Sequence, residues 1–524
     1  MGDISGPGGA SSGGGGGTGG PSAGGPLLPA RIRRLSNAEY DASVQALLGT
    51  AQKPSVAFPP DSRQGSFTLN DAQRIDPVLA KQLDVAALAL VSEARGSGKL
   101  TALASCAAGE ACATTFITGF GARAYRRPLT ADETAALVAV YHAGADGATH
   151  DEGIDLVARA LLQSAGFLYV TELGAPGATA TSKVTLTGNE AAAALSYVLG
   201  GIPPDQPLLD AAGAGQLATG EGREQQARRL LALPAGRDRV VRVVREWFGI
   251  DRIADTAKDS TVYAAFAGVK ASMEAESLRF IDEVMSHGSA TVGELLGADW
   301  TIADAPLAAV YGVSSAGSGR TSLTGVGRRG LLNQGAFLSV YAHASETAPV
   351  LRGVATMRRV ACMALKSPTE LNIVVTPPMP DPSKTTRQRF DVHATDPVCQ
   401  GCHRSIDAFG FAFEGYDGMG KARTTDSNLP IDSATVVATG LDFDGSYADS
   451  NALAAALAAS ADVRTCAARQ IFRASAGRSD DSVAVAEAAF VEAWSALPAD
   501  AQGNLIETLV AFVRSPQFVE RSAR

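Results

Sequence analysis

The sequence predicts a mainly α-helical protein of several domains that includes one loop-rich segment with a CxxCH motif. Alanine and leucine are abundant and aromatic residues make up only 6% of the chain, a composition that favours helix over strand. Apolar residues recur at helical spacing over most of the chain. With 524 residues and 46% hydrophobic content, the chain can build several cores, and its length corresponds to about three or four domains.

Changes in composition along the chain divide it into five segments. Residues 1–29 are a Gly/Ser-rich stretch that we expect to be a disordered tether. An N-terminal helical domain at 30–175 and a second helical domain at 183–312 follow. Segment 322–425 has more glycine and proline and shorter helical runs, and it contains the CxxCH motif. A C-terminal helical domain covers 433–524.

Capping boxes and apolar periodicity predict the individual helices. In three places a serine or threonine is followed three positions later by a glutamate, so helices are expected to begin at Asn37, Ala131 and Gly188. A short extended piece is expected at 436–443. The apolar periodicity predicts helices over 41–48, 77–95, 112–125, 134–142, 154–167, 190–199, 223–233, 237–248, 272–285, 452–459, 463–474, 483–496 and 505–513.

The pentapeptide Cys399-Gln400-Gly401-Cys402-His403 has the spacing of a c-type haem attachment site. Each thiol adds across one vinyl group of the porphyrin, and the histidine that follows then lies under the iron. We therefore predict that Cys399 and Cys402 bind haem c and that His403 is the proximal iron ligand.

Two other interpretations of this motif remain open. Cys399 and Cys402 can instead form a local disulfide, with His403 incidental. A zinc site also uses Cys-x-x-Cys, but it seldom takes ligands from two adjacent positions and normally needs a second pair. The other four cysteines contain no further CxxC, so we favour haem over both alternatives.

The four remaining cysteines can form two disulfides. Cys106 and Cys112 lie on either side of a turn at Gly109 and can close a short loop. Cys362 and Cys466 are then left as partners, and this pairing uses every cysteine once beside the haem pair.

The order of motifs resembles that of a cytochrome-associated multi-domain family of the planctomycete and myxobacterial type, which is built of consecutive domains of unknown function with a CxxCH-bearing domain. The resemblance covers nearly all of residues 30–520 and implies a helical multi-domain fold, export and a haem-binding CxxCH. The stretches that carry it are RRLSNAEY (33–40), RAYRRPLT (123–130), LSY (195–197) with PD (204–205), RGLL (329–332), APVLRG (348–353), CQGCHRSIDAFGFAFEGYDGMG (399–420) and AARQIFRASAGR (467–478).

The candidates for the second axial ligand of the haem iron are histidines and a methionine. His393 lies ten residues before His403, and the family pattern also places a histidine there, so it is the first choice. Met419 is the second choice; its thioether would raise the reduction potential relative to a bis-histidine site. His343 is the third.

Several charged residues are candidates for supporting roles. Arg328, Arg329 and Arg352 are candidates for holding the haem propionates through bidentate contacts.

Three acids follow the motif, namely Asp407, Glu414 and Asp417. Their carboxylates can bind calcium or carry acid/base chemistry. We expect them instead to cap helices and to pair with arginines such as Arg404 or Arg423.

Charge and composition also limit the partners and the compartment. A net charge of −9 and a pI near 5.3 argue against a nucleic acid or an anionic membrane surface as partner. No apolar stretch reaches the length of about 20 residues that a transmembrane helix needs. Haem attachment and six cysteines favour the periplasm or the cell surface, with a signal peptide removed from the sequence shown. The tether is typical of a lipid-anchored protein, so we expect membrane contact only through an N-terminal lipid anchor.

These observations predict an exported c-type haem protein that transfers electrons, or the redox subunit of an oxidoreductase, with an unidentified redox partner. One alternative is a surface scaffold or binding protein with a structural CxxC disulfide. The other is a haem-dependent enzyme with an open sixth iron position. The sequence identifies no catalytic residue, since it contains no Gly-rich phosphate loop, GxSxG elbow or HExxH.

Overall fold

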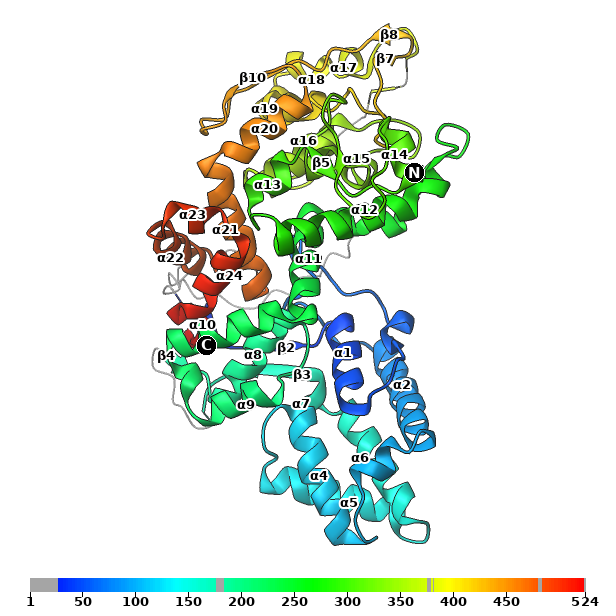
Figure 1. Ribbon diagram of the computed structural model, residues 1–524, viewed down its shortest axis with the longest axis vertical. Coiled ribbons are helices and arrows are strands. Elements are labelled where there is room, and N and C mark those ends of the chain that lie inside the picture. The colour runs from blue at the N-terminus through cyan, green and yellow to red at the C-terminus, as the bar shows by residue number, and fades with distance from the viewer. Residues whose placement is uncertain (1–26, 176–182, 375–377, 380, 479–482, 523–524) are drawn as a thin grey trace.

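The computed structural model describes residues 27–175, 183–374, 378–379, 381–478 and 483–522. Helices make up 58% of the structure and its strands form only five small sheets, so the fold is mainly α, as predicted. The molecule is elongated, with the first helices at one end and the segment that carries the CxxCH motif at the other (Figure 1). Positions 1–26 of the predicted tether lie outside the described residues.

The N-terminal helices pack around a hydrophobic core of their own, at the blue and cyan end of Figure 1. Helices begin at Asn37, Ala131 and Gly188 behind the three predicted capping boxes, and a further box at Thr149 begins another helix. The elements of this region are β2 (Arg31–Arg34), α1 (Asn37–Leu48), α2 (Pro77–Gly96), α3 (Lys99–Leu103), α4 (Glu110–Tyr125), α5 (Ala131–Ala145), α6 (His150–Gln163), α7 (Ala165–Leu168) and β3 (Tyr169–Glu172).

A second, larger core is formed by residues between 186 and 519, together with Leu28 and Phe67. It joins the second helical block, the CxxCH segment and the C-terminal helices, so the domain boundaries predicted within this region remain predictions. Its first elements are β4 (Lys183–Thr185), α8 (Gly188–Gly200), α9 (Gln206–Gly213), α10 (Gly220–Ala232), α11 (Pro234–Phe248), α12 (Phe266–His287), α13 (Val292–Gly297), β5 (Trp300–Thr301), α14 (Ala305–Tyr311), β6 (Thr321–Ser322), α15 (Gly335–Val340) and α16 (Pro349–Arg359).

The C-terminal region is helical after a short hairpin. The extended piece expected at 436–443 is shorter than predicted: β9 (Thr435–Val437) pairs with β10 (Gly445–Tyr447). The four helices predicted in this region are present, with two short ones beside them. These helices are α20 (Ser450–Ala459), α21 (Ala461–Ala476), α22 (Ala484–Ser495), α23 (Ala499–Gly503), α24 (Leu505–Arg514) and α25 (Pro516–Val519).

The end of the chain returns to its beginning. The last strand, β11 (Glu520–Ser522), lies between β1 (Leu28–Pro29) and β4 in a three-stranded sheet. Nearby, the Glu172 carboxylate accepts hydrogen bonds from Arg31 at 2.9 Å and from Arg521 at 2.6 Å, and these side chains are at most 5% exposed. Burial opposes ionisation, but the two guanidinium groups outweigh it and hold the pKa of Glu172 below its usual range.

Two disulfides link Cys106 to Cys112 and Cys362 to Cys466, which confirms both predicted pairings. Their presence indicates an oxidising, extracytoplasmic compartment. Among the described helices, none combines the length and the hydrophobicity needed to cross a membrane.

The carboxyl group of Glu276 is buried, and its hydrogen-bond partners among the described residues are hydroxyl groups. Glu276 on α12 is 1% exposed and accepts hydrogen bonds from the hydroxyls of Thr301 and Tyr311, each at 2.7 Å. Burial raises the pKa of Glu276 to about 7, because desolvation penalises the charged form more than the two hydroxyls stabilise it.

We expect the Cys362–Cys466 disulfide to stabilise the fold more than the Cys106–Cys112 disulfide. The two bonds span 104 and 6 residues, and a longer loop loses more entropy in the unfolded chain when it is closed. In this picture the Cys362→Ala/Cys466→Ala variant loses about 4–5 kcal/mol of unfolding free energy and the Cys106→Ala/Cys112→Ala variant about 2 kcal/mol. Urea unfolding of both variants measures this, and equal losses would contradict it.

Glu276 is expected to make stability depend on pH. The folded protein keeps its proton up to about pH 7, whereas the unfolded chain loses it near pH 4.5. Between these values the folded state binds more protons, so wild-type stability should fall relative to Glu276→Gln as the pH rises, and level off above the window. Urea unfolding of both proteins between pH 4.5 and pH 7 measures the difference in their free energies of unfolding. A difference that does not change with pH would contradict the prediction.

Candidate functional site

The CxxCH motif forms the first turn of helix α19 (Gln400–Phe411). Two short helices, α17 (Thr386–Arg389) and α18 (Val392–Thr395), precede it. Between α18 and α19, the Oδ1 atom of Asp396 accepts hydrogen bonds from the backbone N–H groups two and three residues on, at 2.7 and 3.3 Å. This turn satisfies donors at the start of α19 and fixes how the motif enters the helix.

Helical spacing divides the motif between two faces of α19. Cys402 packs against the larger core, as does Ile406 one turn further on. Cys399, His403 and Asp407 follow one another at intervals of four residues and therefore share another face. Cys399 and Cys402 are three residues apart and therefore lie next to each other, with Cys402 on the side toward the core and Cys399 on the side of His403.

Helix α19 crosses α16 with its backbone in direct contact. A Cβ atom added to Gly353 on α16 would lie 2.1 Å from the carbonyl oxygen of Ile406, and one added to Gly410 would lie 2.2 Å from that of Pro349. Neither position has room for a side chain, because the atoms it would meet belong to backbone. The crossing fixes the position of α19 on the core.

A buried arginine holds the loop that follows α19. Arg352 is fully buried beside Gly353, and its guanidinium donates to the carbonyl oxygens of Leu338, Phe413, Tyr416 and Asp417 at 2.7 to 3.1 Å. Burial lowers the pKa of Arg352 to about 10. Four carbonyl acceptors provide the polar surroundings that a buried charge needs.

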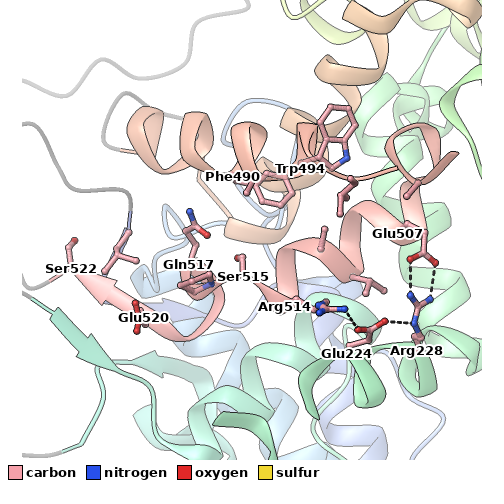
Figure 2. Close-up of a pocket in the computed structure, with 17 residues that line it drawn as sticks. Glu224, Arg228, Phe490, Trp494, Glu507, Arg514, Ser515, Gln517, Glu520 and Ser522 are labelled. Atoms are coloured by element: carbon pink, nitrogen blue, oxygen red, sulfur yellow. Dashed lines mark hydrogen bonds and ion pairs between the residues drawn. The ribbon is translucent and has the colours of Figure 1, made fainter. Parts of the chain in front are cut away.

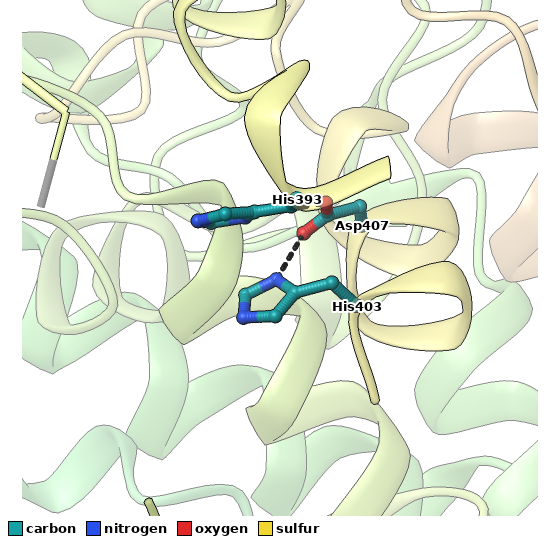
Figure 3. A group of neighbouring side chains, drawn as sticks. All are labelled: His393, His403 and Asp407. Carbon is teal, nitrogen blue, oxygen red and sulfur yellow. Dashed lines mark hydrogen bonds and ion pairs between the residues drawn. The ribbon is translucent and has the colours of Figure 1, made fainter. Parts of the chain in front are cut away.

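Two imidazoles meet one carboxylate on the other face of α19 (Figure 3). The Nδ1 atom of His403 lies 2.9 Å from Oδ1 of Asp407, and the Nδ1 atom of His393 on α18 lies 3.4 Å from Oδ2. The two imidazole ring centres are only 3.7 Å apart. The structure therefore brings together two of the predicted iron ligands, His403 and His393, and adds Asp407.

His403 is oriented as an iron ligand requires. An ionised carboxylate only accepts hydrogen bonds, so the Nδ1 atom of His403 carries the proton that points to Asp407, and the lone pair is on Nε2. Histidine ligands usually donate their other N–H to a carboxylate or a carbonyl, which orients the ring and raises its basicity. The predicted proximal ligand therefore fits the residues around it.

His393 lies closer to His403 than a bis-histidine haem allows. Two imidazoles on opposite sides of an iron have ring centres about 6 Å apart, because each Fe–N bond is about 2 Å long. The observed 3.7 Å leaves no room for a porphyrin plane between the rings. A role for His393 as the second ligand therefore requires the two rings to separate, and that role remains a prediction.

The other two candidates for the second ligand lie elsewhere. Met419 is a buried residue of the larger core, 4% exposed. The glycines on either side of it pack against Tyr263 and α15. His343 is exposed. The structure thus places only His393 directly beside His403.

The two thiols of the motif are the ones that remain free. The structure describes all six cysteines, and Cys399 and Cys402 are the two outside the disulfides. Burial and the neighbouring Asp396 carboxylate raise the pKa of the Cys399 thiol, so it is protonated at neutral pH. Free thiols at this spacing fit covalent attachment of haem.

Two of the three arginines considered for the haem propionates, Arg328 and Arg352, bind groups of the fold instead, so that interpretation is wrong for them and remains a prediction for Arg329. Arg352 binds backbone carbonyls as described above. The guanidinium of Arg328 is buried between the rings of Tyr311 and Tyr416, 3.8 and 4.6 Å from their centres. Arg329 donates to a backbone carbonyl at 3.2 Å.

The acids after the motif have separate partners. Glu414 pairs with Arg423 at 2.9 Å, as expected, and Asp417 accepts backbone N–H groups in a turn. Asp407 differs from the expectation, because its ion-pair partners in the described part of the chain are the two histidines. The sequence held the signal for one contact, since His403 and Asp407 are four residues apart on a helix. Nothing in the sequence indicated the contact between His393 and Asp407.

A cavity of about 870 Å³ lies in another part of the molecule, among the C-terminal helices (Figure 2). Its lining is largely apolar and includes Phe490 and Trp494. The charged groups at one side pair with each other: Arg228 with Glu507 at 2.8 Å, and Arg514 with Glu224. Because these charges are already paired, we assign the cavity no function.

The crossing of α16 and α19 predicts opposite effects for two glycines of α19. Gly410→Ala should lower the free energy of unfolding by roughly 1–3 kcal/mol or more, because its Cβ meets backbone. Gly401→Ala is the matched control: its Cβ meets nothing within 4 Å, so we expect no loss and a gain of up to about 1 kcal/mol from helix propensity. Urea unfolding compares the two, and a tolerated Gly410→Ala would contradict the close crossing.

Four protein-family models match consecutive parts of the chain. PSD3 (DUF1587) matches residues 33–96, PSD5 (DUF1595) matches 112–172, PSD4 (DUF1592) matches 186–313 and PSCyt3 (DUF1588) matches 328–426, and each is described as a protein of unknown function. The CxxCH motif lies inside the last match. No curated protein and no solved structure matches the chain. Residues 33–426 therefore match consecutive PSD and PSCyt domain models, an arrangement consistent with a multi-domain, cytochrome-associated family.

Proposed function

We propose that this protein is an exported c-type haem protein that transfers electrons, or the redox subunit of an oxidoreductase, with one haem attached at Cys399 and Cys402. The observation that carries the proposal is the state of the cysteines. Four of the six form disulfides, and the two that remain free are those of the CxxCH motif. The match of the PSCyt3 model over residues 328–426 supports it through the cytochrome association in that name.

Different residues of the site bind different parts of the haem. Cys399 and Cys402 supply the two thioether bonds, and the crossing of α16 and α19 keeps them in place from the core side. His403 offers Nε2 to the iron while Asp407 holds its Nδ1–H. When bound, haem iron supplies a one-electron redox couple. The Asp407 carboxylate makes the imidazole a stronger donor, which stabilises the oxidised form and lowers the reduction potential.

The proposal includes the location. Disulfides persist in oxidising compartments, and c-type haem is attached outside the cytoplasm. We place the protein in the periplasm or at the cell surface.

Covalent haem is tested by producing the protein in hosts with and without the haem-attachment machinery. We expect protein from the competent host to be coloured and to show one added haem by intact mass under reducing conditions. Cys399→Ala/Cys402→Ala should abolish the addition, because no thioether bond can form. The matched control, Cys106→Ala/Cys112→Ala, removes two cysteines of the N-terminal core and should keep the haem.

Three outcomes separate the alternatives. Colourless protein from the competent host, with Cys399 and Cys402 joined to each other, would overturn the proposal in favour of a scaffold with a structural disulfide. Coloured protein whose reduced form binds carbon monoxide would indicate an open sixth position and a haem-dependent enzyme. Coloured protein that does not bind carbon monoxide supports electron transfer.

A further inference from the structure

We propose that the form of this protein without attached haem binds one divalent first-row transition metal ion through His393, His403 and Asp407. The site goes beyond the proposed function, because it takes a bare ion in place of a porphyrin and uses neither thiol. It shares His403 with the proposed haem site, so each chain holds one group or the other.

The three side chains are grouped closely enough to act as ligands of one such ion. Each residue offers one ligand atom, and the three atoms lie within 4.8 Å of one another. The Nδ1 atoms of the two histidines lie 2.9 and 3.4 Å from the oxygens of Asp407. Ligands bound at about 2.1 Å are separated by about 3.0 Å in octahedral and about 3.4 Å in tetrahedral geometry. Little movement is needed to bring all three onto one ion.

The fold holds these side chains in position. His403 and Asp407 are one turn apart on α19, which is fixed against α16 by the glycine crossing. His393 comes from α18, and the ring of Phe390 lies edge-on against its imidazole with centres 5.0 Å apart. The Asp396 turn connects the two helices. The site is therefore built from two joined helices and not from a mobile loop.

His393 has an unused ligand atom in this site. The residue is 9% exposed, and its Nδ1 atom is buried without a hydrogen-bond partner. Leaving a buried polar nitrogen unpaired is unfavourable, because the atom loses its hydrogen bonds to water and gains none in the protein. Coordination to a metal ion would satisfy this nitrogen.

Asp407 also lacks a compensating charge. Its side chain is 13% exposed, and within the described residues its ion-pair partners are His393 and His403, with no lysine or arginine. Buried carboxylates are normally paired with a cation or bound to a metal. A divalent ion would supply the missing charge.

The ligand set defines the class of metal. Two imidazoles and one carboxylate suit zinc or iron(II), with the remaining positions open to water or to a small ligand. The thiols of Cys399 and Cys402 are not among the clustered ligand atoms. His403 is 20% exposed, which gives an ion a route into the site.

The test uses full-length protein from a host without haem-attachment machinery, treated with a chelator and a thiol reductant. Zn²⁺ is titrated by calorimetry, and Co²⁺ is used as a spectroscopic probe. We expect one ion per chain and Co²⁺ d–d bands without a thiolate charge-transfer band. His393→Ala and Asp407→Asn should each weaken Zn²⁺ binding at least about tenfold, since even an outer-shell partner of a metal ligand is worth that much.

Two control variants test whether Zn²⁺ binding depends on the three proposed ligands and not on other residues. His287→Ala removes an exposed histidine of α12 and should leave Zn²⁺ affinity unchanged. Cys399→Ser/Cys402→Ser should also bind Zn²⁺ as the wild type does. Circular dichroism checks that each variant keeps its helical content.

Several results would overturn the metal site. These are no Zn²⁺ binding by folded wild type, an affinity unchanged in folded His393→Ala, or a thiolate band in the Co²⁺ spectrum. The last result needs no variant and would assign the ion to the cysteines. Because haem attachment is measured in a different host and by mass, either proposal can fail while the other stands.

Discussion

The candidate site depends on the contact between the backbones of α16 and α19. Gly353 and Gly410 bring the two helices so close that neither position accepts a Cβ atom. Next to this contact, the Arg352 guanidinium donates to four backbone carbonyls from α15 and from the loop after α19. Burying that charge is costly, and the cost is offset only because its acceptors are held in place. The arginine and the two glycines therefore stabilise one arrangement of the CxxCH helix.

Because α19 is fixed to the core on one side, the side chains on its other face are available to bind a ligand. Cys402 packs against the core, whereas His403 and Asp407 meet His393 of α18 on another face. The same face can thus present an imidazole to a haem iron or combine two imidazoles and a carboxylate around a bare ion. In the haem site Asp407 decides which nitrogen of His403 is free, because the carboxylate accepts the proton at Nδ1 and leaves Nε2 for the iron.

Much of the helical architecture could be predicted because its signals are local. A capping box involves residues three positions apart, so the helix starts at Asn37, Ala131 and Gly188 were readable without tertiary information. The disulfide pairing followed from counting the cysteines left after the CxxCH pair was set aside. The roles of Arg328 and Arg352 could not be predicted, because their acceptors are backbone carbonyls that carry no signal in the sequence. Assigning them to haem propionates was the corresponding error.

Residue type and short-range spacing are enough to predict the helical class, most helix positions, the Cys106–Cys112 disulfide and the CxxCH motif. The Cys362–Cys466 pair followed by counting the cysteines that were left. Which side chains contact His403 depends on the tertiary packing. Asp407 lies within one helical turn of it, but His393 reaches it only because a turn at Asp396 folds α18 back onto α19. Contacts between separate elements depend on how the helices pack, and packing is fixed by shape and backbone contact across the whole core and not by local spacing.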